Sequence, residues 1–147
     1  MKHLDLKEIR NEEQRKYYAE IDKKGICPFC LENFNIDKDH EILQENDSWL
    51  VTWNRYPYDG TKYHFLLVYK KSHATHPNQI SVDDKLDLFN LIDWINSEYK
   101  INYGSFVMRY GDEGNGSSVR HLHAHIIVGQ SNTKTDKAVR AKIGYGK

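Results

Sequence analysis

The spacing of apolar residues separates strand-like segments, which repeat every two residues, from a helical segment, which repeats every three or four. Residues 49–53 alternate as a strand does, and residues 64–69 form a short apolar run suited to a buried strand. Turn residues at Asn46-Asp47 divide 41–54 into two extended pieces. The predicted strands are two within 41–54 and others over 64–69, 103–110, 119–128 and, as a short addition, 138–143.

Helices are predicted before and after the first strands. Ser81, with Asp84 three residues later, is typical of a helix start, and apolar residues recur at helical spacing toward Tyr99. The residues of this repeat are Leu86, Phe89, Ile92 or Leu91, and Ile95. A second, highly charged helix is predicted over 4–24, ending near Gly25. The elements indicate an α+β fold, an antiparallel sheet of about five strands with two main helices.

Length and charge narrow the class of protein. The 147 residues match the size of one domain, and an aromatic content of 12% excludes a disordered chain. No apolar run approaches the roughly 20 residues of a membrane-spanning helix, and residues 1–7 lack the apolar stretch of a secretory signal. Lys+Arg and Asp+Glu both number 21, and this neutral balance argues against a nucleic-acid partner. We therefore expect a cytoplasmic protein that binds neither membrane nor nucleic acid.

Cys27 and Cys30 form a Cys-x-x-Cys pair, too closely spaced to be a useful structural disulfide. In a reducing compartment such a pair is half of a zinc site, a redox pair or two packed thiols. A redox pair usually opens a helix directly after a strand, whereas this one follows a charged segment and Gly25. A zinc site needs two further ligands, so the pair alone leaves the three possibilities open.

Histidine occupies alternate positions of the predicted strand over 119–128. His121, His123 and His125 are expected to share one face of it, while the intervening apolar residues face the core. The glycine-rich loop that ends at 116–118 can offer N–H groups and hydroxyls to an anion. A purely structural strand has little reason to collect such a row. It indicates either a three-histidine metal centre or nucleophilic catalysis at phosphorus by a neutral histidine.

The histidine-bearing stretch over 121–127 resembles the signature of the histidine-triad (HIT) family of nucleotide hydrolases and transferases, in which histidines alternate with apolar residues. The resemblance extends upstream to a Tyr-Pro-Tyr loop in 54–58, an apolar strand over 64–68 and a basic turn over 70–73. The segment 27–30 is similar to the N-terminal zinc knuckle of many bacterial members. The family therefore supplies expectations for fold, reaction and ligands.

The resemblance implies a reaction and a set of residues for it. His123 is expected to attack the α-phosphorus of a nucleotide conjugate, such as a dinucleoside polyphosphate or a phosphoramidate, giving a nucleotidyl-histidine intermediate that water or another acceptor resolves. The catalytic residues implied are His123, His125, His121 and Ser118. Those implied for substrate binding are Phe29, Trp53, Asn54, Arg109, Gly116 and Ser117, with Lys70, Lys71 and Arg120 as further basic candidates.

The resemblance also implies a structural zinc ion, no organic cofactor and a homodimer. The implied zinc ligands are Cys27, Cys30, His73 and His121, with His76 and His40 as competing candidates. The implied organisation is a single HIT-like domain over 1–147, with the helix over about 4–24, a core over about 25–130 and a C-terminal extension over 131–147. Two other functions stay open. One is a nucleotide-binding regulatory module with little turnover, and the other is a zinc-dependent hydrolase that uses the three triad histidines as ligands.

Overall fold

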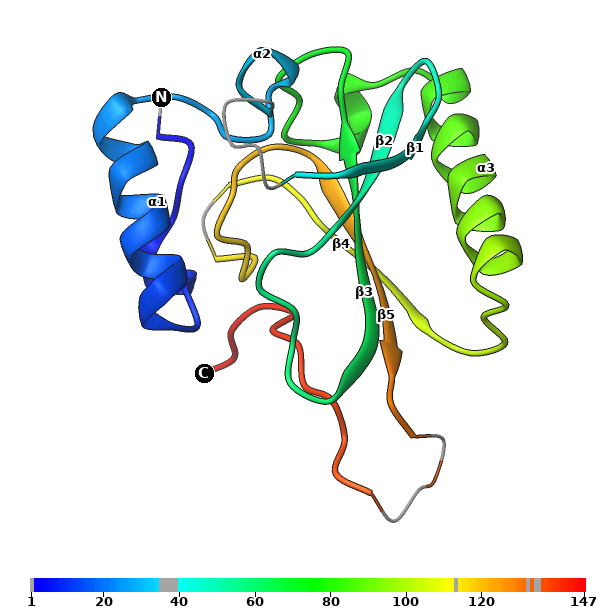
Figure 1. Cartoon of the computed structure of the whole chain (residues 1–147). Helices are drawn as coiled ribbons and strands as arrows, with labels where there is room; N and C mark the ends of the chain where they lie inside the picture. Colours follow the sequence, from blue (N-terminus) through cyan, green and yellow to red (C-terminus); the bar gives the residue numbers. More distant parts are fainter. Residues whose placement is uncertain (1, 35–39, 113, 132, 134–135) are drawn as a thin grey trace.

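A computed structural model of the chain describes residues 2–34, 40–112, 114–131, 133 and 136–147, and its centre is an antiparallel sheet (Figure 1). Among these residues the sheet has five strands in the order β1-β2-β3-β5-β4, and every neighbouring pair is antiparallel. The strands are β1 (Ile42–Glu45), β2 (Trp49–Trp53), β3 (Thr61–Tyr69), β4 (Ser105–Arg109) and β5 (His123–Gly129). The helices are α1 (Glu12–Lys24), α2 (Leu31–Phe34) and α3 (Val82–Glu98), with 3₁₀ turns at Leu6–Glu8 and Pro77–Gln79. The predicted α+β fold is confirmed.

Helix α3 covers one face of the sheet and begins where the sequence predicts (Figure 1). Ser81 caps it: its hydroxyl accepts from the backbone N–H of Asp84, and the Asp84 carboxylate accepts from the backbone N–H of Ser81. This capping box satisfies two donors that the helix start would otherwise leave unpaired. The helix buries Leu88, Leu91 and Ile95 against the apolar residues of β2, β3 and β5.

The face of α3 that contacts the sheet agrees with the predicted repeat at Leu91 and Ile95 and differs from it in the first half of the helix. Leu86 and Phe89 are 58% and 56% exposed, and the sheet is contacted by the face that carries Asp84 and Leu88. The Asp84 carboxylate accepts hydrogen bonds from three side chains of the sheet and the turn after β3: Ser48 Oγ (2.8 Å), Tyr69 OH (2.8 Å) and Lys71 Nζ (2.6 Å). Because these bonds hold Asp84 against the sheet, the helix turns Leu86 and Phe89 outward.

We expect Asp84→Asn to lower the free energy of unfolding by about 2 kcal/mol, because it weakens charge-assisted hydrogen bonds at a buried group. Burial raises the pKa of Asp84, but the hydrogen bonds from Lys71 and Ser48 lower it by more than burial raises it. The net pKa therefore lies below its usual value. The carboxylate therefore contributes stability above about pH 4, where it is also ionised in the unfolded chain, and this contribution is lost as the pH falls toward the native pKa.

Urea unfolding of wild type and Asp84→Asn at pH 7 and pH 3 measures this contribution. The exposed neighbour Asp83 provides the matched control, Asp83→Asn, which removes the same charge without a buried network. The difference between wild type and Asp84→Asn is expected to shrink at pH 3. Equal losses in the two variants at pH 7 contradict the role given to Asp84.

The opposite face of the sheet packs against the N-terminal part of the chain (Figure 1). Side chains from both sides form this second core: Leu4, Ile9, Tyr18, Phe29, Leu50, Leu66 and Val68. The predicted helix over 4–24 ends at Gly25 as expected, where φ is +65°, a conformation that glycine adopts readily. Its start is later than predicted, because Asn11 caps α1 and the residues before it run beside another segment, with Leu4 bridging Val119.

The predicted strand over 119–128 is shorter than expected, because its first residues bind elsewhere. The Arg120 N–H donates to His3 O at 2.8 Å and the Leu122 N–H donates to Ala74 O at 2.7 Å, so β5 begins only at His123. The prediction of a strand over 138–143 is wrong: the chain there is irregular. None of the helices in the described parts of the chain combines the length and the apolar character needed to cross a membrane.

Candidate functional site

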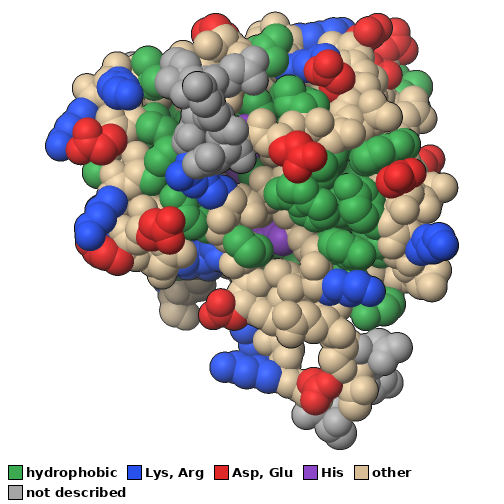
Figure 2. Space-filling model, in the orientation of Figure 1, with side chains coloured by type: hydrophobic (Ala, Val, Ile, Leu, Met, Phe, Trp, Pro, Cys, Tyr) green, Lys and Arg blue, Asp and Glu red, His purple; other side chains and the backbone are tan. Residues whose placement is uncertain are grey.

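His123 and His125 line a cavity of about 330 Å³ on the α1 side of the sheet, a volume in the range of small-molecule sites. The structure brings eight of the predicted site residues to it: Phe29, Asn54, Arg109, Gly116, Ser117, Ser118, His123 and His125. Lining residues that sequence reasoning missed include Glu8, Arg10, Tyr58, Arg140 and Lys142. Histidine reaches the surface only in small patches in the view of Figure 2, in keeping with the burial of both triad rings.

The ring of His123 is held in one tautomer. Its Nδ1 lies 2.6 Å from the carbonyl oxygen of His121, which can only accept, so we assign the proton to Nδ1 and the lone pair to Nε2. Phe29 packs edge-on against the ring, with centroids 4.9 Å apart. Burial lowers the pKa of His123 to about 4, despite the opposing effect of the carbonyl. At neutral pH the ring is therefore an uncharged base with its lone pair on Nε2.

The second ring, His125, is oriented by His64 of β3, which sequence reasoning missed. The backbone N–H of Tyr58 donates to His64 Nδ1 at 3.2 Å, so the His64 proton is assigned to Nε2. That nitrogen lies 2.8 Å from His125 Nδ1 and donates to it, which leaves His125 with its own proton on Nε2. The Tyr58 ring lies nearly parallel to the His125 ring, at 6.1 Å and 21°. His125 is thereby set as a hydrogen-bond donor.

Donors outnumber acceptors around these rings. Asn54 Nδ2 lies 3.1 Å from His64 Nε2, and Arg109 Nη1 lies 3.4 Å from His125 Nε2, so N–H groups face nitrogens already assigned a proton. Burial, with the charges of Arg10 and Arg109, lowers the pKa of His64 to about 3 and holds that of His125 well below its usual value. A positively charged site with surplus donors is suited to an anion, whose oxygens accept hydrogen bonds.

The glycine-rich loop reaches the cavity through Gly116, where φ is +87°. A Cβ there would lie 3.0 Å from Lys142 Cβ and 3.4 Å from Arg109 Nε, so the loop can pass this point only as glycine. The hydroxyl of Ser117 donates to Val119 O at 2.9 Å and is therefore engaged within the loop. Gly116, Ser117 and Ser118 thus form one edge of the cavity, as the sequence predicts.

Two predicted site residues lie away from the cavity. Trp53 stacks on Phe65, with centroids 4.6 Å apart, in the aromatic cluster on the α3 side of the sheet. It shares that side with Trp49 and Val51 because alternate residues of a strand share a face, so Trp53 lies away from this cavity and the expected contact between Trp53 and a substrate gains no support from it. His121 precedes β5 and turns its ring toward the two cysteines rather than toward the cavity.

Several other candidates have different partners. Lys70 pairs with Glu45 at 2.9 Å and Lys71 with Asp84, so neither lines the cavity. The competing metal ligands are also used elsewhere: His76 Nδ1 accepts from Asn78 N–H at 3.2 Å, and His40 stacks on Phe34.

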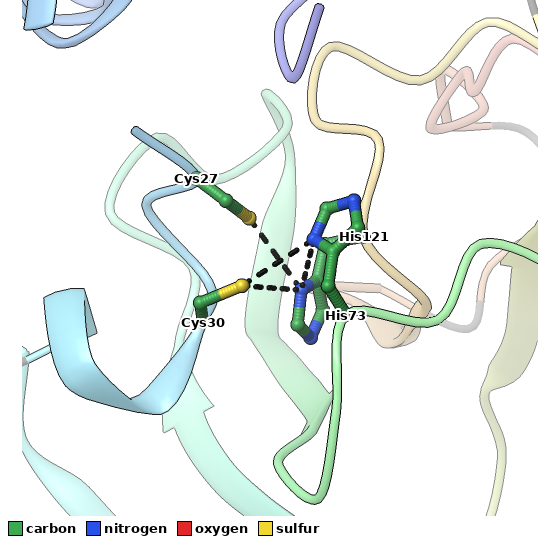
Figure 3. A group of neighbouring side chains, drawn as sticks. All are labelled: Cys27, Cys30, His73 and His121. Carbon is green, nitrogen blue, oxygen red and sulfur yellow. Dashed lines mark hydrogen bonds between the residues drawn. The ribbon is translucent and has the colours of Figure 1, made fainter. Parts of the chain in front are cut away.

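Cys27, Cys30, His73 and His121 bring four ligand atoms within 4.8 Å of one another, with the sulfurs facing the two imidazoles (Figure 3). The two Nδ1 atoms are 3.3 Å apart, and two sulfur–nitrogen pairs, Cys30–His73 and Cys27–His121, are 3.3 and 3.5 Å apart. Tetrahedral zinc, with bonds of about 2.05 Å to nitrogen and about 2.3 Å to sulfur, separates two nitrogens by about 3.3 Å and nitrogen from sulfur by about 3.6 Å. The donor set and its spacing fit a tetrahedral zinc ion.

His121 is oriented toward this cluster by its second nitrogen. Nε2 lies 2.6 Å from the carbonyl oxygen of Tyr69 and donates to it, so Nδ1 presents a lone pair to the cysteines. Burial raises the pKa of Cys27 and raises that of Cys30 to about 12, which keeps both as thiols unless a metal displaces their protons. With His121 committed here, the three triad histidines do not converge on one point.

Comparisons with known proteins agree with this architecture. The family model of the HIT domain matches residues 35–132. Among solved structures, a HIT family hydrolase from Legionella pneumophila is 22% identical, with a TM-score of 0.56 over 75% of this chain and 98% of that one. Diadenosine triphosphate hydrolase from Plasmodium falciparum is 22% identical, with a TM-score of 0.52 over 69% and 65% of the two chains. A zinc-bound histidine triad family protein from Mycobacterium smegmatis is 16% identical, with a TM-score of 0.53 over 76% and 82%. No curated protein sequence matches.

Proposed function

Because the chain belongs to the HIT family, we propose that it is a nucleotide hydrolase or nucleotidyltransferase acting at the α-phosphate of a nucleoside phosphate conjugate. The observation that carries the proposal is the His123 ring, whose Nδ1 is bound to the His121 carbonyl and whose Nε2 lone pair is free in a cavity lined by surplus donors. The similar Plasmodium falciparum protein, a diadenosine triphosphate hydrolase, supports a substrate of this class.

The proposed reaction has two displacements at phosphorus. His123 Nε2 donates its electron pair to the α-phosphorus, a P–N bond forms, and the bond to the leaving group breaks with its electron pair on that group. Water then attacks the α-phosphorus, the P–N bond breaks, and the electron pair returns to His123. The water proton leaves to solvent or to the departed group, and the products are a nucleoside monophosphate and the free leaving group. With another acceptor in place of water the same steps give transfer.

The surrounding residues stabilise the charge that this reaction develops. We expect His125 Nε2–H and the Arg109 guanidinium to donate to the non-bridging oxygens, with the loop at Gly116 and Ser118 lining the cavity beside them. Asn54 lines the cavity and is assigned to the ribose, and Phe29 to the base side of His123. Positioning and electrostatics supply most of the catalysis in phosphoryl-type transfer, and this donor-rich cavity offers both.

We propose that zinc occupies the Cys27, Cys30, His73 and His121 cluster in a structural role, since all four ligand positions are filled by protein atoms. The ion would join the N-terminal segment to the start of β5. In this arrangement His121 is a metal ligand and His123 a nucleophile, so a catalytic zinc bound by the three triad histidines has no geometric support.

We propose a homodimer formed through β4, which lies at an edge of the sheet in the described residues. Phe106 of β4 is 43% exposed, and its ring lies 6.0 Å from that of Phe89 of α3, which is also exposed. A strand edge beside exposed aromatic residues favours pairing with a second copy. We expect Phe106→Glu to convert dimers to monomers in light scattering at unchanged circular dichroism, and a wild-type protein that is monomeric contradicts the proposal.

A further inference from the structure

The wall of the cavity includes two segments that lie outside the part matched by the family model. Arg10 precedes the match over 35–132, and Arg140 and Lys142 follow it. These three cations face a single acid, Glu8, which comes from the same N-terminal segment. Any ligand group that these two segments bind is therefore recognised by parts of this chain outside the matched core.

The C-terminal tail is docked on the cavity by specific contacts. Lys142 O accepts from Arg109 Nε at 2.7 Å, and the Lys142 ammonium pairs with Glu8 at 3.0 Å. Tyr145 OH donates to the other oxygen of Glu8. Earlier in the tail, Val139 packs against Gly60: its Cγ2 lies 3.4 Å from the point where a Cβ on Gly60 would be. Figure 1 shows the tail in red, returning from the end of β5 toward the side that carries α1.

Arg109 and Arg10 lie at the His125 end of the cavity, and Arg140 lines the same cavity. Arg109 connects the tail to this ring, since its Nη1 lies 3.4 Å from His125 Nε2 while its Nε donates to the tail. The Arg10 guanidinium lies over the Tyr58 ring, 4.2 Å from its centroid, and the Tyr58 ring is in turn nearly parallel to the His125 ring. Lys142 is neutralised by Glu8, which leaves Arg140 as the exposed cation that the tail brings to the cavity.

The α-phosphate undergoing reaction already has donors in His125, Arg109 and the loop. Arg10 and Arg140 supply two further charges to the lining of the same cavity. Guanidinium groups bind phosphate strongly through paired, charge-assisted hydrogen bonds. Arg10 also donates to Tyr56 O, whereas Arg140 is exposed, so the phosphates of a polyphosphate leaving group would give Arg140 oxygens to bind that an amine leaving group lacks.

We propose that Arg140, together with Arg10, forms a subsite for phosphate groups of the leaving group, and that the chain prefers nucleoside polyphosphate conjugates to phosphoramidates. This inference rests on the proposed function and specifies its substrate class. The tail, held by Glu8, is then a specificity determinant.

The experiment compares kcat/KM for diadenosine tetraphosphate with kcat/KM for adenosine 5′-phosphoramidate in wild type, Arg140→Gln and Lys137→Gln. Lys137 lies in the same tail but away from this cavity, so its variant removes an equal charge as a matched control. We expect the ratio of the two values to fall roughly tenfold in Arg140→Gln, the effect of one charge-assisted hydrogen bond, and to match wild type in Lys137→Gln. An unchanged ratio in Arg140→Gln overturns the subsite while leaving the proposed function intact.

Measurements of equilibrium binding test the subsite without requiring turnover. Calorimetry on the His123→Ala background compares ATP with AMP, which differ by the phosphates that the subsite would hold. We expect ATP to bind more tightly, and Arg140→Gln to reduce that advantage roughly tenfold. Equal affinities for ATP and AMP overturn the subsite. A retained ATP preference in a wild-type protein without turnover supports the subsite and contradicts only the proposed function.

Discussion

Turnover of a dinucleoside polyphosphate is expected to fall by about 10³-fold or more in His123→Ala, the scale of losing a covalent nucleophile. The reason is that no other lone pair is placed to replace Nε2: His125 is assigned a proton at the corresponding atom, and His121 faces the cysteines. Nucleotide binding should survive, because the donors of Arg109 and the loop remain. Loss of rate with retained affinity for AMP is the signature of a group that acts in the reaction itself.

Two measurements examine this expectation. Quenching of wild type and a labelled substrate with denaturant at alkaline pH, where a phosphorus–nitrogen bond to histidine survives, should trap an adduct on His123, and the adduct should be absent from the variant. His76→Ala is the matched control, since His76 caps a turn outside the cavity. Near wild-type turnover by His123→Ala contradicts the mechanism. A wild-type protein that binds AMP but forms neither adduct nor product is instead a regulatory binding module.

Removing zinc is expected to lower the melting temperature by roughly 10 °C. A ligand present at about 1,000 times its dissociation constant stabilises by about 4 kcal/mol, and for a chain of about 150 residues each kcal/mol corresponds to roughly 2–4 °C. The cluster links residues far apart in the chain, since Cys27 and His121 are 94 positions apart. Without the ion, one buried thiol, one half-buried thiol and two imidazoles are held together with no metal bond to stabilise them.

Metal analysis of protein purified without chelator should give about one zinc per chain, and calorimetric melting before and after chelation gives the shift. Cys30→Ser should bind zinc more weakly and melt lower than wild type even without chelator. Ser72→Ala, beside a ligand but outside the ligand set, is the control. A zinc content near zero, or a melting temperature that chelation leaves unchanged, contradicts the structural role.

The parts of the fold that could be predicted are those with a clear periodic pattern. Residues 49–53 and the helix from Ser81 follow from alternation and from a capping pattern, both of which are local. The buried face of α3 could be predicted only in its second half, because apolar residues occur around the first turns and the choice there depends on the hydrogen bonds of Asp84. Similarly, the late start of α1 could not be predicted, because the residues before it run beside a segment more than a hundred positions away, with Leu4 bridging Val119.

The residues of the candidate site likewise fall into those that a local sequence pattern predicts and those that only long-range contacts identify. His123 and His125 are visible as an alternating pattern, and the HIT signature makes them specific. A single histidine within an apolar run, such as His64, has no pattern of its own and is identified only by its contact with His125. Arg10 and Arg140 reach the cavity through long-range packing of both chain ends. The alternation of side chains along β2 could also have been applied to Trp53, because it places this residue on the same face as Trp49 and Val51, toward the core.

The ring and the backbone carbonyl of His121 contact two different groups. Its ring faces the cysteines, while its carbonyl oxygen fixes the proton on His123 Nδ1. A change in ring position on loss of the ion, or on oxidation of either sulfur, is therefore passed along a single peptide unit to the reacting imidazole. Under the proposed mechanism, the reaction rate at His123 would then depend on the thiol redox state and the metal supply of the protein's surroundings.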